Sequence, residues 1–154
     1  MSFMRNKLGY GQGLIIYVLV ATASMLAVST MAKTIVVGGS EGWRFGFNYT
    51  DWAFQNGPFY LNDTLVFKYA PPNSTTFPHS VYMLHEFWSF LKCDLRRAKM
   101  VGNVTDGGGE GLKFVIKMWK PYFFACGQLN GFHCDVGRMK FAFFPIPHCR
   151  NTHG

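Results

Sequence analysis

The chain has 154 residues, a formal net charge of +7, and 18% aromatic residues. This length suits a single domain of ordinary size. No basic run is longer than Arg96-Arg97, so we expect no nucleic-acid binding; the charge indicates general solubility or a weak attraction to acidic surfaces.

The start of the chain has the pattern of a secretory signal. Arg5 and Lys7 give a positive first segment, and Leu14–Val28 is an apolar run that ends in small residues around Thr30 and Ala32. The alternative is a membrane anchor. The apolar run has about 15 residues, however, and a membrane-spanning helix needs roughly 20. We therefore expect a signal peptide that is cut after Ala32.

This cut predicts the domain organisation and the location of the protein. Residues 1–32 form the signal peptide, residues 33–147 the domain, and residues 148–154 a short tail without the apolar tract of a lipid-anchor signal. Loss of Arg5 and Lys7 lowers the net charge from +7 to +5. We expect a secreted, extracellular or cell-wall (apoplastic) protein that has no membrane span after signal removal.

Four N-x-Ser/Thr sequons support a secretory route, since each can carry a glycan there. None has proline in the middle position. They begin at Asn48, Asn62, Asn73 and Asn103.

Short runs of alternating apolar and polar residues follow, separated by turn residues such as glycine, proline and asparagine. Period-two alternation bounded by turns is typical of a β-sandwich or barrel. In one run, Leu112, Phe114, Ile116 and Met118 are expected to share a face. The predicted strands are Thr34–Val37, Thr64–Tyr69, Leu112–Trp119, Tyr122–Ala125 and Lys140–Phe144.

Two short stretches are predicted to be helical. Thr50–Asn56 has a candidate cap at Thr50 or Asp51, and His85–Leu91 is short and aromatic. We interpret most of the aromatic residues as core, because a sandwich of this size needs no ligand to explain them.

The most informative stretch is Tyr122–Lys140, which places Cys126 and His133 on one loop. A thiolate and two imidazoles in one plane select copper and support one-electron cycling. His79 is the candidate for the second imidazole. The competing histidines are His85, His148 and His153.

The cysteines also allow a simpler interpretation. In an oxidising compartment, four cysteines commonly form two disulfides, and the sequence alone permits three pairings. The copper interpretation removes one cysteine from that set. The four are Cys93, Cys126, Cys134 and Cys149.

Several motifs together resemble the plant phytocyanins, the secreted blue-copper branch of the cupredoxins. TIVVGGSEGW is similar to the opening strand and Gly-Trp turn of that family, and NYTDWAFQNGPFYLNDTLVFKYAPP to its Trp-Ala segment and following strand. PHSVYML resembles the first copper histidine with its strand. KCD resembles the first cysteine of the structural disulfide, and YFFACGQLNGFHCDVG the copper loop. The resemblance runs from about Thr34 to Phe144.

The resemblance implies an all-β, cupredoxin-like Greek-key β-sandwich of seven or eight strands with one or two short helices. It also implies that His79, Cys126 and His133 bind one type 1 copper ion, and that Cys93 and Cys134 form a disulfide. The pairing state of Cys149 stays open.

Two departures from the family pattern concern the copper loop. Six residues separate Cys126 from His133, where the family usually has four. The position of the usual axial ligand holds Arg138, whose guanidinium has no lone pair to offer. Met139 follows one residue later, and a local bulge would bring its sulfur to the metal. We expect Met139 on the copper side and Arg138 in solvent.

The expected function is therefore single-electron transfer at a mononuclear copper site. The alternative is a copper-free, early-nodulin-like extracellular glycoprotein with a binding or wall-associated role. The chain carries no other acid–base or nucleophile constellation, so we do not expect an enzyme. We expect a monomer with a redox partner that the sequence does not identify; an acidic cell-surface component is the candidate.

Overall fold

The computed structural model describes residues 31–148. The predicted signal peptide up to Thr30, together with Cys149 and His153, lies outside the described residues. Among the described residues, no helix is both long enough and apolar enough to cross a membrane.

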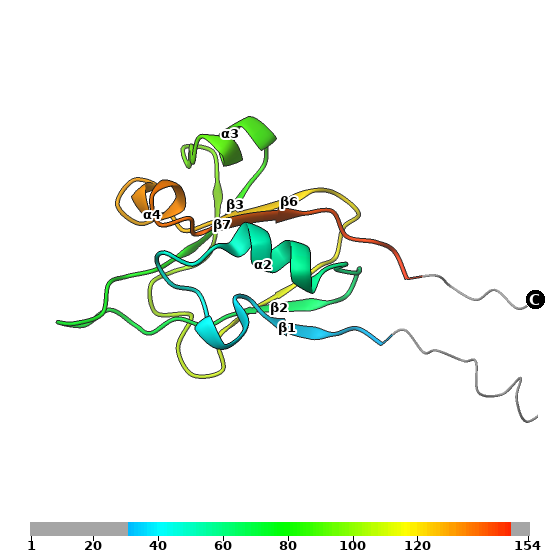
Figure 1. Ribbon diagram of the computed structural model, residues 1–154, viewed down its shortest axis with the longest axis horizontal. Coiled ribbons are helices and arrows are strands. Elements are labelled where there is room, and N and C mark those ends of the chain that lie inside the picture. Colours follow the sequence, from blue (N-terminus) through cyan, green and yellow to red (C-terminus); the bar gives the residue numbers. More distant parts are fainter. Residues whose placement is uncertain (1–30, 149–154) are drawn as a thin grey trace, which may run out of the picture. The chain divides into compact units, whose positions relative to one another are not determined.

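Seven strands form two sheets in this part of the chain (Figure 1). The first sheet has the order β1-β2-β5, in which β1 pairs with β2 in parallel and β2 with β5 antiparallel. The second has the order β4-β3-β6-β7 and is antiparallel throughout. The prediction of a seven- or eight-stranded β-sandwich is confirmed. The strands are β1 (Thr34–Val36), β2 (Thr64–Phe67), β3 (Val81–Leu84), β4 (Lys99–Gly102), β5 (Leu112–Val115), β6 (Tyr122–Ala125) and β7 (Lys140–Phe143).

The strand predicted at Leu112–Trp119 is too long. β5 ends at Val115, and Met118 is 53% exposed instead of sharing the buried face with Ile116. The chain leaves the sheet because the amide of Met118 donates to the hydroxyl of Tyr122, and the amide of Lys120 donates to the carbonyl of Met118. Alternation alone did not predict β4, which is mostly exposed.

Within residues 31–148, three short α-helices and a 3₁₀ turn, η2 (Gly39–Glu41), accompany the sheets. The first predicted helix is present as α2 (Tyr49–Asn56). Its cap is Asn48 and not Thr50 or Asp51, because the Asn48 side chain accepts a hydrogen bond from the amide of Asp51. The second is present as α3 (Phe87–Leu91), and α4 (Phe132–Asp135) was not predicted.

Aromatic side chains fill the space between the two sheets. The rings of Phe67 from β2 and Phe124 from β6 meet with centroids 5.3 Å apart, and Phe141 from β7 lies 5.5 Å from Phe124. α2 packs on β7 (Figure 1). Trp52 of α2 contacts Phe141 of β7 there. The aromatic residues therefore form core, as the sequence indicated.

The second sheet is covered on both faces, which explains why all four residues of β6 are buried. Tyr122 and Phe124 point between the sheets, and Phe123 and Ala125 point to the other face, under α3. Phe90 of α3 packs against Phe123 there. By the same alternation, the next residue, Cys126, belongs to the inner face.

Candidate metal centre

Three of the predicted donors meet at one end of the second sheet. The candidate ligand atoms of His79, Cys126 and His133 all lie within 4.8 Å of one another. The Nδ1 atoms of the two imidazoles are 3.2 Å apart, and Cys126 Sγ is 3.6 Å from His133 Nδ1. Among residues 31–148 this is the one such group of three or more histidine, cysteine or acidic side chains.

The topology of the sheet explains why distant residues converge. His79 lies just before β3, and Cys126 follows β6 directly. β3 and β6 are antiparallel neighbours, with Tyr82 opposite Ala125, so the start of one strand lies beside the end of the other. The amide of Ser80 accordingly reaches Cys126 Sγ at 3.5 Å.

The longer loop returns His133 to this site by a tight turn. Leu129 and Asn130 have φ angles of 50° and 51°, and Gly131 has a φ of 87°. These three successive left-handed residues reverse the chain and lead into α4, which contains His133. The two additional loop residues therefore do not separate the histidine from Cys126.

Burial keeps the imidazoles neutral. His79 and His133 are only 8% and 4% exposed. Burial, followed by the influence of His133, lowers the pKa of His79 to about 4, and burial lowers the pKa of His133 as well. A neutral imidazole is the form that binds a metal.

The thiol experiences two opposing effects. Burial raises the pKa of Cys126, whereas hydrogen bonds from Gln128 and Ser80 act to lower it. A positive metal ion would favour the thiolate much more strongly than these hydrogen bonds do.

Ser80 supports the site by hydrogen bonds that no sequence motif indicated. Its hydroxyl oxygen accepts hydrogen bonds from the amide of Gly127 at 3.2 Å and from the Gln128 side chain at 2.9 Å. Its carbonyl accepts from Trp43 Nε1 at 3.0 Å. Ser80 thus ties the segment that carries His79 to the segment that carries Cys126. The position of Ser80 directly after His79 was the one feature of the sequence that could have indicated this role.

The other histidines among the described residues lie elsewhere. His85 is exposed beyond β3, and His148 stacks on Tyr60 with ring centroids 4.9 Å apart. Neither belongs to the group of three donors. A buried set of one thiol and two neutral imidazoles fits a copper ion better than a hard cation such as magnesium or calcium.

The two candidates for the axial position differ in burial. Arg138 has a φ of 54° and is exposed, and Met139 is fully buried. The left-handed Arg138 is a local irregularity two positions before β7 begins at Lys140, of the kind that a bulge at this place requires.

A disulfide joins Cys93 to Cys134, with Cα atoms 5.8 Å apart. Cys134 directly follows His133, so the bond fixes α4 to the segment that follows α3. Lys140 of β7 also binds the end of α3. Its ammonium group donates to the carbonyl of Leu91 at 2.9 Å and to that of Phe90 at 3.3 Å. Cys126 is the free cysteine of the described part of the chain.

Comparison with known proteins places the chain among copper proteins. No family model matches the sequence. It is 39% identical over 128 residues to blue copper protein 1a of Medicago truncatula, covering 80% of this chain and 69% of that protein. Blue copper protein 1b of the same plant is 38% identical over 129 residues, with the same coverage.

The fold also resembles those of solved blue copper proteins and their relatives, including two from cucumber. Cucumber basic protein, a blue copper protein, matches with a TM-score of 0.55 and 26% identity, covering 73% of this chain and 99% of that chain. Cucumber stellacyanin matches with a TM-score of 0.58 and 22% identity, covering 76% and 98%, which supports the fold alone.

The two sheets and the buried histidine–cysteine–histidine group define the cupredoxin class. Given its identity to the two Medicago proteins over most of their length, the chain belongs to the plant phytocyanins, a family of blue copper proteins.

Proposed function

We propose that the protein is a secreted carrier of single electrons, with one copper ion bound by His79, Cys126 and His133. The observation that carries this proposal is the convergence of these three donor atoms within 4.8 Å in a buried site. Bound copper supplies a reversible one-electron couple, which none of the side chains has by itself.

The protein residues contribute binding, position and exclusion of water. The buried imidazoles are neutral at ordinary pH and need not lose a proton to bind a cation. Ser80 holds the segments of His79 and Cys126 together, and the Cys93–Cys134 disulfide holds that of His133. A site fixed in this way does not have to rearrange when the charge of the metal changes, and this favours rapid electron transfer.

Met139 would be a fourth, weak ligand of the ion. It is fully buried and belongs to the same inner cluster as Cys126. Arg138 is exposed and does not compete for this place.

Secretion and the choice of partner rest on the sequence. The signal-like residues 1–32 and the four sequons support export, and a mature chain of charge +5 favours an acidic partner at the cell surface. Amino-terminal sequencing of the exported protein tests the first point, since the mature chain is expected to begin at Lys33.

The experiment for the copper centre is an absorption spectrum and a voltammogram of the copper-loaded mature protein. We expect one copper per chain, an intense visible thiolate-to-copper band and a reversible one-electron wave. Cys126→Ser should remove the band, and His79→Ala should weaken copper binding. His85→Ala is the matched control, because His85 is an exposed histidine outside the site. A colourless protein that keeps no copper after dialysis would contradict the proposal.

A further inference from the structure

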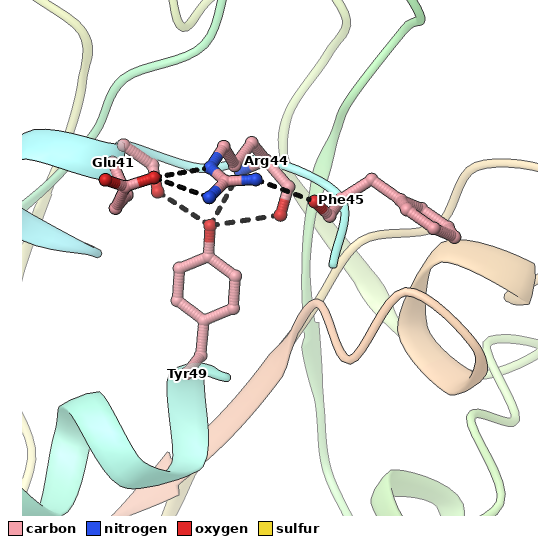
Figure 2. A network of polar contacts seen from close by, with 5 residues as sticks. Glu41, Arg44, Phe45 and Tyr49 are labelled. Carbon is pink, nitrogen blue, oxygen red and sulfur yellow. Dashed lines mark hydrogen bonds and ion pairs between the residues drawn. The ribbon is translucent and has the colours of Figure 1, made fainter. Parts of the chain in front are cut away.

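A polar network fixes the loop that precedes α2. The buried hydroxyl of Tyr49 donates to the carbonyl of Gly42 at 2.6 Å and accepts from the amide of Arg44 at 2.6 Å (Figure 2). Arg44 pairs with Glu41 on one side and donates to the carbonyl of Phe45 on the other. The backbone that carries Phe45 is therefore anchored from both the core and the surface.

The side chain of Phe45 extends away from this network (Figure 2). It lies against His133, a residue of the metal site. Its ring meets the imidazole of His133 edge to face, with centroids 5.2 Å apart. It also stacks on Phe132, with centroids 5.9 Å apart and planes 20° from parallel. Phe45 and Phe132 are 38% and 47% exposed, while His133, whose imidazole meets the Phe45 ring, is only 4% exposed.

The ligand loop is shaped to receive this ring. The amide of Gly46 donates to the carbonyl of Gly137 at 2.8 Å, which joins the Phe45 loop to the end of the His133 loop. A Cβ atom at Gly137 would lie 2.5 Å from the Phe45 ring and 2.5 Å from the carbonyl oxygen of His133. Only glycine therefore leaves room for the ring at this place.

The His79 side of the site borders a surface groove, whereas the His133 side does not. His79 lines an open surface groove of about 630 Å³, and His133 is not among the residues that line it. The walls come from three loops and include Trp43, Lys68, Tyr69, Thr76 and Gly108. One imidazole thus borders an open groove, and the other is covered by the ring of Phe45, which itself stacks on Phe132.

We propose that Phe45, backed by Phe132, is a positioning residue that closes the His133 side of the centre, so that water and small molecules reach the centre along the groove beside His79. The copper-dependent part of this inference rests on the proposed function. The cover, meaning the shielding of His133 by the ring of Phe45, is a property of the folded chain and can be tested without metal.

The first experiment measures how fast diethyl pyrocarbonate modifies each histidine in the metal-free, folded protein at neutral pH, by mass spectrometry of the peptides. In the wild type, His79 should react faster than His133. Phe45→Ala should accelerate modification of His133 severalfold and leave that of His79 unchanged. Tyr49→Phe removes the hydroxyl anchor of the loop and should act in the same direction, less strongly.

Phe54→Ala is the matched control, because Phe54 is a 90% exposed phenylalanine on α2 and contacts neither histidine. Phe45→Tyr retains the ring and should behave as the wild type. Should Phe45→Ala fail to fold, Phe132→Ala, which truncates the other exposed ring, replaces it. Equal modification rates of His133 in Phe45→Ala and Phe54→Ala would overturn the proposal, as would a wild-type His133 that reacts faster than His79.

The second experiment uses the copper-loaded protein and azide as a small external ligand. Phe45→Ala should let azide perturb the visible spectrum at a lower concentration than in the wild type, and Phe54→Ala should not. An unchanged azide response would overturn the role of the cover in access. Failure to load copper would instead contradict the proposed function, and the metal-free labelling would still decide on the cover.

Discussion

The amide of Cys126 donates a 2.9 Å hydrogen bond to the carbonyl of Met139. This bond continues the register of β6 and β7, in which Ala125 lies opposite Lys140 and Phe124 opposite Phe141. Residues directly opposite each other in an antiparallel pair point to the same face of the sheet, with Cβ atoms about 5 Å apart. Met139 therefore lies on the face of the thiol, and Arg138 does not.

Met139→Gln is expected to shift the reduction potential and the visible spectrum while copper stays bound. A weak axial ligand tunes the potential more than it holds the ion, because the thiolate and the imidazoles supply most of the binding. Voltammetry and absorption of the loaded protein measure both effects. Arg138→Ala, one residue away and exposed, is the control and should change little. If neither property moves in Met139→Gln, Met139 is a core residue and no side chain occupies the axial position.

Ser80→Ala should alter the spectrum of the copper-loaded protein without unfolding it. The substitution leaves the backbone amide of Gly127 and the side-chain nitrogen of Gln128 without their shared acceptor, next to Cys126. Loss of such a hydrogen bond typically costs about 1 kcal/mol, and it loosens the segment that positions the thiolate. We expect a shifted thiolate band and a changed potential. Ser40→Ala removes an exposed hydroxyl from η2 and is the control; equal spectra for the two variants would argue against a role of Ser80.

The meeting of His79, Cys126 and His133 was predictable because the motifs around all three resemble those of the phytocyanins, and Cys126 and His133 share one loop. The sequence was not sufficient for the surroundings of the site. Phe45 reaches His133 through a contact between residues 88 positions apart in the sequence, and α4 depends on three left-handed residues that have no strong propensity signal. Strand ends were also misplaced where a side-chain hydrogen bond, such as that of Tyr122, turns the chain early.

Removal of the Cys93–Cys134 disulfide by a double alanine substitution should lower the free energy of unfolding by roughly 3–4 kcal/mol, by the chain-entropy estimate for a loop of this size. The two cysteines are 41 positions apart. Chemical denaturation of the metal-free protein measures the loss. The variant should also bind copper more weakly, since Cys134 directly follows His133. Cys149→Ser serves as the control. A dominant Cys93–Cys149 or Cys134–Cys149 bridge in non-reducing peptide maps would contradict the assignment.

The four sequons should differ in how well they accept a glycan. Asn73 and Asn103 lie in exposed loops, where their side-chain oxygens accept hydrogen bonds from the hydroxyls of Thr75 and Thr105 at 2.9 Å and 2.7 Å. These bonds use the oxygen and do not involve the amide nitrogen, which is the atom that is glycosylated.

Asn48 is the opposite case. Its side-chain nitrogen donates to the carboxylate of Asp51 at 2.6 Å while its oxygen caps α2. A glycan on this nitrogen would disturb a cap that typically stabilises a helix by about 1 kcal/mol.

Glycopeptide mass spectrometry of the exported protein should therefore find higher occupancy at Asn73 and Asn103 than at Asn48. Asn73→Gln and Asn103→Gln should each remove one glycan and leave the unfolding midpoint of the deglycosylated protein unchanged, whereas Asn48→Ala should lower that midpoint. Highest occupancy at Asn48 would show that modification precedes formation of this cap and is not governed by the folded loops.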